Sequence, residues 1–315
     1  MKRFLLLLAL AGVAPLAQAQ AFPQRPIEIV NAFAPGGAND LNVRALQIPG
    51  ERILGQPLVQ IFKQGGGGIV GSTEVANAPP DGYKLLVVTS GELTAAPNLA
   101  KTTYSLDSFS FLGRLSSKPY ALVVKADAPW KTFGELLRST NEQAGRHSIA
   151  TTPAGGMFLT AQHLIRRGGV LLTTVPYGGA GPAITALLGG HIDSVWAPLA
   201  AAEAQVKAGA LRLLAVTGPA RVAGHPNTPT FREMGIEAPF VQWTGLVAPK
   251  GLPADRLQAL RDAVAKIAAD PVYLQLADKF GIEVSYASAE EFEKQVRDED
   301  LVFRALVKDF GLTPK

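Results

Sequence analysis

Four loops of small residues follow strand-like segments of the sequence and have the composition of anion-binding loops. The first is APGGAND, residues 34 to 40, where a Gly-Gly pair would expose successive backbone N–H groups at the start of a helix. Unpaired N–H groups and the positive end of a helix dipole bind carboxylates and other anions. An ordinary strand-to-helix turn with Asn39 or Asp40 as N-cap is the alternative, and this loop taken alone favours that alternative.

The other three loops share this composition and also end predicted strands. They are Thr89-Ser90-Gly91, Thr151-Thr152-Pro153-Ala154-Gly155-Gly156 and Tyr177-Gly178-Gly179-Ala180-Gly181-Pro182. In open α/β sheets, ligands bind beyond the carboxyl ends of the strands. Because the loops fall in both halves of the chain, they predict a cleft that offers backbone N–H groups and small hydroxyls to an anion from two sides.

The sequence supports an enzyme, a nucleotide-binding site or a metal site less well than an anion-binding cleft. The glycine run Gly65 to Gly68 is followed by Ile69 and Val70, not by the Lys and Ser or Thr of a P-loop. The four histidines are scattered, and cysteine and the G-x-S-x-G motif are absent, so neither a metal site nor a cofactor is expected. A triad of Ser90 with a distant His and Asp stays open, because such sites depend on geometry and not on chain order.

Aromatic residues offer candidates for the wall of the cleft. Trp196 and Trp243 each follow strand-like segments and could stack on a ligand, with core packing as the equally good alternative. Tyr177, beside a glycine loop, is the better pocket candidate of the three.

The elements that must position these loops alternate between strand, glycine turn and helix, which predicts an α/β fold with a mostly parallel sheet. The rhythm begins at Ile27 to Phe33 and starts again at Tyr120, so two α/β domains are expected. Capping boxes at Thr132 to Glu135 and Ser288 to Glu291 predict helix starts. Pro49-Gly50 predicts a kink or an early stop in the first helix.

The N-terminal segment has the organisation of a secretory signal peptide. Lys2 and Arg3 precede an apolar run too short to span a membrane, and small residues in A-x-A arrangement predict cleavage near Ala19 or Ala21. The net charge is only +4 and no basic run follows, so no nucleic-acid partner is expected. With no cysteine for lipid attachment, a periplasmic protein that is not a lipoprotein is predicted, and full secretion remains the alternative.

Several stretches resemble the Bug family, the periplasmic solute-binding receptors of tripartite tricarboxylate transporters. The resemblance covers almost all of the mature chain in family order, in the stretches FPQRPIEIVNAFAPGGAND, LGQPLVQ, GGGGIVGSTEVANAPPDGYKLLVVTSG, TTVPYGGAGPAITALLGGHID, VKAGALRLLAVTG, NTPTFREMGI and TGLVAPKGLP.

This resemblance implies a two-lobed periplasmic-binding-protein fold (type II-like), with residues 22–121 and 245–315 as domain I and 122–244 as domain II. It implies a monomeric receptor that is not an enzyme, holds a small carboxylate in the cleft and delivers it to integral-membrane transporter subunits. A ligand sensor for a two-component system is the alternative. The ligand-binding positions it implies, with Asp40 fastening its loop, are Ala34, Pro35, Gly36, Gly37, Asp40, Thr89, Ser90, Thr151, Thr152, Ala154, Gly155, Gly156, Tyr177 and Gly178.

Two departures from the family pattern concern the ligand. A stretch that is often polar in the family reads Pro153-Ala154-Gly155-Gly156-Met157-Phe158, and Ala197-Pro198 stands behind Trp196 where Asp-Asn is frequent. Fewer side chains are then present to pair a ligand's hydroxyl or ammonium groups, and unpaired buried polar groups cost about 1 to 3 kcal/mol each. An aromatic or otherwise weakly hydroxylated carboxylate is therefore the predicted ligand.

Overall fold

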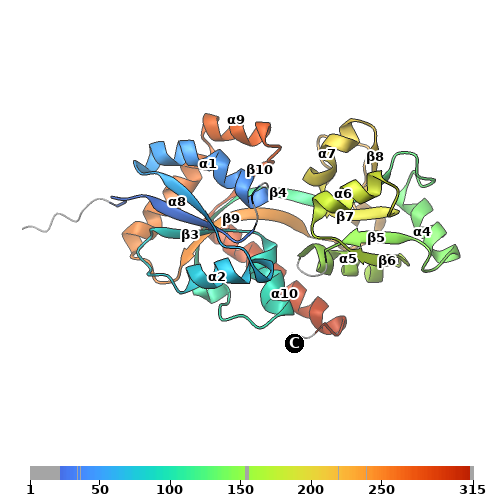
Figure 1. Cartoon of the computed structure of the whole chain (residues 1–315), viewed down its shortest axis with the longest axis horizontal. Helices are drawn as coiled ribbons and strands as arrows, with labels where there is room; N and C mark the ends of the chain where they lie inside the picture. The colour runs from blue at the N-terminus through green and yellow to red at the C-terminus, as the bar shows by residue number, and fades with distance from the viewer. Residues whose placement is uncertain are drawn as a thin grey trace, which may run out of the picture.

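The computed structural model describes residues 22–33, 35, 37–152, 156–218, 220–238 and 240–312, and these form two α/β lobes side by side (Figure 1). The expected signal segment, 1–21, lies outside the described residues. The strands are β1(Ile27–Asn31), β2(Leu58–Phe62), β3(Lys84–Val88), β4(Phe109–Lys125), β5(Ser148–Thr151), β6(Thr173–Pro176), β7(Ser194–Pro198), β8(Leu211–Val216), β9(Val241–Pro249) and β10(Val284–Ala287).

Helices cover the faces of the sheet in both lobes (Figure 1). The α-helices are α1(Ala38–Leu54), α2(Ile69–Ala76), α3(Ala96–Leu99), α4(Phe133–Glu142), α5(Gly156–Arg167), α6(Ala180–Leu188), α7(Leu199–Lys207), α8(Ala254–Ala268), α9(Pro271–Lys279) and α10(Ala289–Asp309). Short 3₁₀ turns occur at η1(Gly66–Gly68), η3(Leu106–Ser108) and η4(Arg232–Met234), and a π-helical turn, η2(Gly91–Ala95), directly follows Ser90.

The first lobe is built on the strand order β2-β1-β3-β9-β4, with β10 paired to β4. Strands β2, β1 and β3 are parallel, so their carboxyl ends meet at one edge. Apolar side chains on both faces of this sheet form two cores, one beneath α1, α8 and α9 and one beneath α2 and α10. The first lobe can therefore hold its strand-end loops on a packed, rigid base.

The second lobe is built on β7, β5 and β6, which are parallel, and on the end of β4, which pairs antiparallel with β7 and β8. Its core is a single large cluster that contains Trp196 and Phe231. Phe303, Leu306 and Val307 of α10 belong to this cluster, so the C-terminal helix starts on the first lobe and ends packed against the second.

Two long strands connect the lobes. Strand β4 pairs with β9 from Phe109 to Pro119 and with β7 from Tyr120 onward, so the backbone changes sheet between these two neighbours. The sheet is mixed and not mostly parallel as the sequence predicts, because β4 and β9 run antiparallel to their partners. The strand and helix rhythm of each lobe is as predicted.

Local signals in the sequence were mostly reliable. Ser288 and Glu291 cap each other's backbone N–H groups at the start of α10, and the Thr132 side chain caps α4. Of the two alternatives predicted at Pro49-Gly50, the early stop was wrong, because α1 continues to Leu54, and the kink stays a prediction. Gly50 has a packing role there: a Cβ at this position would lie 2.3 Å from Leu58 Cδ1, so glycine lets the helix approach β2 closely.

Candidate ligand-binding site

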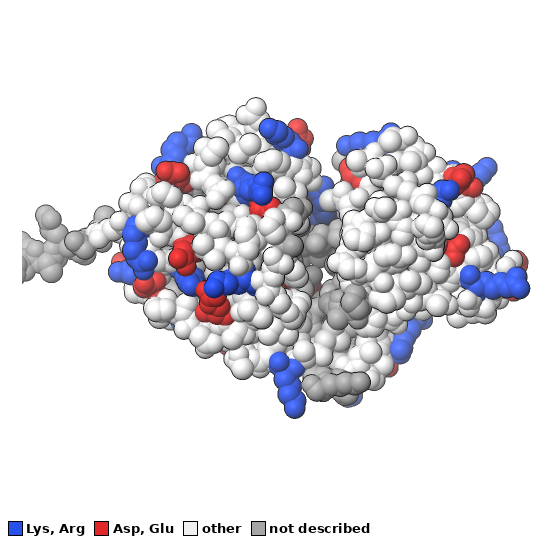
Figure 2. All heavy atoms as spheres, in the orientation of Figure 1, with Lys and Arg blue, Asp and Glu red and all other residues white. Residues whose placement is uncertain are grey.

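An open cleft with a volume of about 720 Å³ lies between the two lobes. This volume is in the usual range for small-molecule sites. Ser116 and Lys118 of β4 and Gln242 and Thr244 of β9 form its floor. The space-filling view shows the groove that separates the lobes (Figure 2). Residues lining its walls include Gly37, Leu41, Asn42, Ala180, Gly181, Pro198, Ala200, Glu203, Lys207 and Lys279.

Three helices begin at this cleft, one from the first lobe and two from the second. Their N-cap residues are Gly37 of α1, Gly179 of α6 and Pro198 of α7, and in the described structure no side chain caps any of the three. Backbone N–H groups in the first turn of a helix have no partner within the helix. The cleft therefore faces positive helix ends from both sides, an arrangement suited to an anion.

On the first lobe, the predicted loop after β3 is held by a residue that sequence reasoning missed. Glu92 of η2 is fully buried, and its Oε2 accepts hydrogen bonds from the Thr89 backbone N–H (2.9 Å) and the Thr89 hydroxyl (2.5 Å). Its Oε1 accepts a hydrogen bond from Asn39 Nδ2 in the first turn of α1 (2.9 Å). Glu92 thus joins two of the predicted loops, and the side chain of Thr89 is already engaged within the lobe.

A second, partly buried carboxyl lies behind the same loop. Glu299 of α10 contacts the Thr94 hydroxyl (2.6 Å) and accepts a hydrogen bond from Trp243 Nε1 (2.7 Å). Thr94 Oγ1 also lies 2.8 Å from the Ser90 carbonyl oxygen. A hydroxyl has one proton, so a neutral Glu299 completes both contacts by donating to Thr94. Burial raises the pKa of Glu299 to about 7, which agrees with this arrangement.

On the second lobe, backbone and hydroxyl contacts hold the predicted loops together. The Tyr177 N–H donates to the Thr151 carbonyl oxygen (2.8 Å), and the Thr151 hydroxyl donates to the Met157 carbonyl oxygen (3.0 Å). The Thr160 hydroxyl donates to the Gly156 carbonyl oxygen (2.7 Å). These bonds bring the ends of β5 and β6 and the start of α5 to one place.

The lobes approach each other at Ser90 and Gly156. A Cβ on Gly156 would lie 3.0 Å from Ser90 Oγ and 3.5 Å from the Tyr120 hydroxyl. Tyr120 is the residue at which β4 changes sheet, and its ring stacks on that of Trp196 at 5.7 Å. Two predicted site residues from different lobes thus meet directly above the connecting strand.

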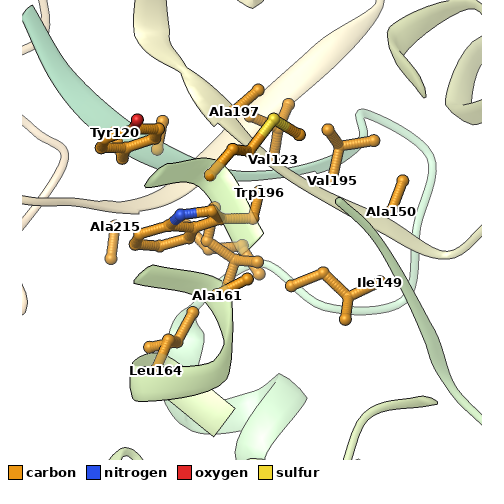
Figure 3. Close-up of a cluster of buried hydrophobic side chains, with 14 of the residues drawn as sticks. Tyr120, Val123, Ile149, Ala150, Ala161, Leu164, Val195, Trp196, Ala197 and Ala215 are labelled. Atoms are coloured by element: carbon orange, nitrogen blue, oxygen red, sulfur yellow. The ribbon is translucent and has the colours of Figure 1, made fainter. Parts of the chain in front are cut away.

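Trp196 is a core residue in this structure, as the core-packing alternative predicts. It is fully buried among Tyr120, Val195 and Leu164, and its Nε1 donates to the Thr160 hydroxyl (2.8 Å) (Figure 3). The assignment of Trp196 as a wall of the pocket is corrected accordingly, because Tyr120 covers one face of the indole. Trp243 is likewise fully buried.

The remaining predicted positions fall into four groups. Asp40 is buried in the first turn of α1 and pairs with Arg44 at 2.9 Å. Pro35 and Gly178 are exposed, and Thr152 and Tyr177 are partly buried. Ala34, Gly36, Ala154 and Gly155 lie outside the described residues.

Lys118 lies in the cleft but is not among the ligand-binding positions predicted from the sequence. Its side chain is half-buried, and its Nζ donates to the Gly281 carbonyl oxygen at 2.5 Å. No described acidic group lies within 4 Å of this Nζ, whereas Lys207 in the cleft wall pairs with Glu203 at 3.2 Å. Burial lowers the pKa of Lys118. The cleft floor thus presents a cation without a carboxylate within 4 Å in the described chain, while Glu283 and Glu203 of the cleft lining act on it from a greater distance.

The described part of the chain contains no assembled catalytic group and no assembled metal-binding group. Ser90 has no hydrogen bond to a histidine there, and His147, His163 and His225 are engaged with Ser139, Glu237 and Glu203. The described residues contain no cluster of three His, Asp or Glu side chains placed for a metal ion. None of the described helices is long and apolar enough to cross a membrane.

Comparison with known proteins agrees with this geometry. The family model described as "Tripartite tricarboxylate transporter family receptor" matches residues 43–312. The chain belongs to this family. The receptor is 32% identical over 97% of its length to a UPF0065 protein from the gbd 5′ region of Cupriavidus necator, covering 93% of that protein.

Solved structures show the same fold for the receptor. The periplasmic binding protein BugD is 30% identical, with a TM-score of 0.80, over 93% of this chain and all of BugD. MatC from Rhodopseudomonas palustris, solved with bound malate, is 27% identical, with a TM-score of 0.77, over 91% of this chain and all of MatC. These comparisons confirm the Bug-family prediction and the two-lobed periplasmic-binding-protein fold.

Proposed function

We propose that the receptor captures a small carboxylate in the cleft between its lobes and delivers it to the membrane subunits of a tripartite tricarboxylate-type transporter. The observation that carries this proposal is the convergence of three helix starts without side-chain caps, from both lobes, on one cleft. The malate bound to MatC supports a carboxylate as the ligand class. No covalent chemistry is needed.

Closure of the lobes would couple binding to delivery. A ligand that contacts both lobes only when they are closed shifts the population toward the closed form. Strands β4 and β9 connect the lobes, so bending where β4 changes sheet at Tyr120 would serve as the hinge. The membrane subunits would then recognise the closed receptor.

The domain limits and cellular location follow from the same proposal. We place residues 22–121 and 245–315 in domain I and 122–244 in domain II, with the end of α10 resting on domain II. Family membership implies a periplasmic receptor. Export would use residues 1–21 as signal peptide, with cleavage near Ala19 or Ala21. The receptor is proposed to act as a monomer.

A ligand panel tests the carboxylate proposal. Isothermal titration with benzoate, adipate, malate, citrate and aspartate should give binding to at least one of them. An aromatic or weakly hydroxylated acid is expected to bind most tightly, because the loop from Pro153 to Phe158 carries few polar side chains. Tight citrate or aspartate binding with no response to benzoate would end the aromatic hypothesis, and no binding by any acid would end the carboxylate proposal.

Two variants test the site itself. Gly37→Val adds bulk at the start of α1 and should weaken binding at least tenfold. Gly134→Val is the control, because a Cβ at Gly134 meets nothing within 4 Å. Equal affinity of Gly37→Val and the wild type would remove this loop from the site.

Ser90→Ala separates the receptor from an exported hydrolase. A receptor loses at most the contribution of one hydrogen bond, about 0.5 to 1.5 kcal/mol of affinity. A hydrolase would lose turnover on ester or amide substrates. Any turnover that disappears with Ser90 would replace the receptor proposal by an enzymatic one.

A further inference from the structure

The carboxyl group of Glu92 joins the two predicted ligand loops of the first lobe. Three of its hydrogen-bond donors belong to those loops: the Thr89 N–H, the Thr89 hydroxyl and the Asn39 side-chain amide. Thr89 follows β3, and Asn39 lies in the first turn of α1, whose N-cap Gly37 lines the cleft. One carboxyl group therefore sets the position of both loops relative to each other.

The fold closes tightly around this side chain. A Cβ on Gly68 would lie 2.4 Å from Glu92 Cγ, so the glycine run before α2 makes room for the carboxyl. The Tyr104 hydroxyl donates to the Glu92 backbone oxygen (2.7 Å) and closes the other side. The π-helical turn η2 allows Glu92 to fold back onto Thr89, and such turns are frequent at functional sites.

No cation neutralises Glu92 in the described part of the chain. Ionisable groups on the elements around it have other partners: Asp40 pairs with Arg44, Lys84 with Glu74 and Glu28, Asp300 with Arg304, and Glu299 contacts Thr94 and Trp243. His163 of α5 contacts the Glu237 carbonyl oxygen. The negative charge of an ionised Glu92 is therefore stabilised by these three donors, by its own backbone N–H and by the positive end of α1.

We propose that Glu92 is the positioning residue of the first-lobe half of the site, and that it takes up a proton when a carboxylate binds at the start of α1. This proposal rests on the proposed function. An ionised Glu92 and a bound carboxylate would share the positive end of one helix, and two carboxylates that share a site cannot both stay charged without cost. The buried carboxyl is the one that can become neutral without leaving its place.

The direction of the pH dependence follows from linkage. Burial raises the pKa of Glu92 to about 7, so the free receptor holds this carboxyl partly ionised near neutral pH. A ligand that raises this pKa further must bind more tightly to the protonated form, because the coupling is reciprocal. Affinity is therefore highest below pH 7 and falls as the pH rises above 7.

Titration calorimetry in two buffers measures this proton directly. Wild-type receptor is titrated with benzoate, adipate, malate and citrate at pH 7 in phosphate and in Tris, whose ionisation enthalpies differ. The expected result is uptake of up to about 0.5 proton per ligand bound, since a group at its pKa is half ionised. Between pH 6 and 8.5 the Kd should weaken roughly fivefold, the lower end of usual coupling.

Glu92→Gln assigns the proton, because it keeps the shape of the side chain but cannot titrate. Uptake should disappear and the affinity should become independent of pH. Glu299→Gln and Tyr104→Phe are the controls, and both should keep the proton uptake. The first removes the neighbouring, partly buried carboxyl, and the second removes the hydrogen bond to the Glu92 backbone oxygen. If Glu92→Gln does not fold, Asn39→Ala replaces it and should move the uptake midpoint to higher pH, because a donor to the ionised form is lost.

The outcomes are distinguishable. Three results overturn the role of Glu92 and leave the receptor function intact. The wild type binds a probe without proton uptake, the uptake persists in Glu92→Gln, or the uptake midpoint is unchanged in Asn39→Ala. Failure of these four acids and of aspartate to bind overturns the carboxylate function itself, and the role of Glu92 with it.

Discussion

The half of the site on the first lobe is braced by carboxyl groups, whereas the half on the second lobe is held by hydroxyl and backbone hydrogen bonds above an aromatic and apolar core. Glu92 is fully buried and Glu299 is partly buried, and their carboxyls hydrogen-bond to Thr89, Asn39 and Thr94. Across the cleft, Tyr120 and Trp196 stack within a large apolar core. Hydrogen bonds fix the direction of the groups they join, and carboxyl groups gain or lose a proton as the pH changes. Apolar packing fixes the position of side chains and does not depend on pH.

This difference assigns separate tasks to the lobes. Hydrogen bonds that fix direction suit the first lobe, where the backbone N–H groups of α1 must point into the cleft. A packed aromatic base suits the second lobe, where the connecting strand β4 enters and must carry the lobe as a unit during closure. Stability and ligand affinity should therefore respond to different kinds of substitution on the two sides.

The largest effect is expected from Trp196→Ala on the apolar side. It removes a fully buried indole from the second-lobe core and should lower the free energy of unfolding by about 3 to 5 kcal/mol. Urea unfolding measures this loss, which should be the same at pH 5 and pH 8. Trp196→Phe should cost less, since it keeps the ring stacked on Tyr120, and a strong pH dependence of the loss would break the distinction between the lobes.

The next effect concerns Glu299 on the polar side. Its pKa is about 7 in the folded protein against an ordinary value of 4.5, so the folded state keeps a proton that the unfolded state releases between these values. The stabilisation of the folded state by this proton is fully present below about pH 4.5. The free energy of unfolding then falls by up to about 3 kcal/mol as the pH rises to 7.

Glu299→Gln should therefore reduce the decline in stability between pH 5 and pH 8, as measured by urea unfolding at both values. Asp298→Asn is the matched control, because Asp298 is exposed on the same helix and pairs with Lys294. An unchanged decline in Glu299→Gln would show that the buried carboxyl does not titrate in this range.

A smaller effect is expected where the two lobes meet. Gly156→Ala places a methyl group 3.0 Å from Ser90 Oγ, so closing the lobes needs a shift of a few tenths of an ångström. Carboxylate affinity should fall roughly three- to tenfold, about 0.6 to 1.4 kcal/mol. Calorimetry measures the change, Gly134→Ala serves as the control in open space, and unchanged affinity would mean that the lobes do not close on this contact.

The smallest effect is expected at Lys118, on the floor between the two regions. Lys118→Met removes a half-buried cation and should weaken adipate or malate binding about threefold, with little effect on benzoate, because partly exposed ion pairs contribute about 0.2 to 1 kcal/mol. Lys207→Met is the control, since Lys207 already pairs with Glu203. Equal weakening of mono- and dicarboxylates would show a general effect of charge.

Much of the architecture could be read locally. The capping signals at Thr132 and Ser288 mark the starts of α4 and α10 as predicted. These features depend on a few neighbouring residues, so the sequence displays them. Glu92 could not be found in this way, because its partners Asn39 and Thr89 lie in two loops that meet only when β1 and β3 pair.

The sequence by itself determined the two-lobed α/β fold, the glycine loops at strand ends and the family, because these follow from local periodicity, turn residues and matching stretches. Only the tertiary structure decided that Trp196 is core and that α1 continues through Pro49. It also decided that a buried carboxyl joins two loops of the site. Each of these depends on which distant residues meet in space, and burial, close packing and a shifted pKa arise only from such contacts.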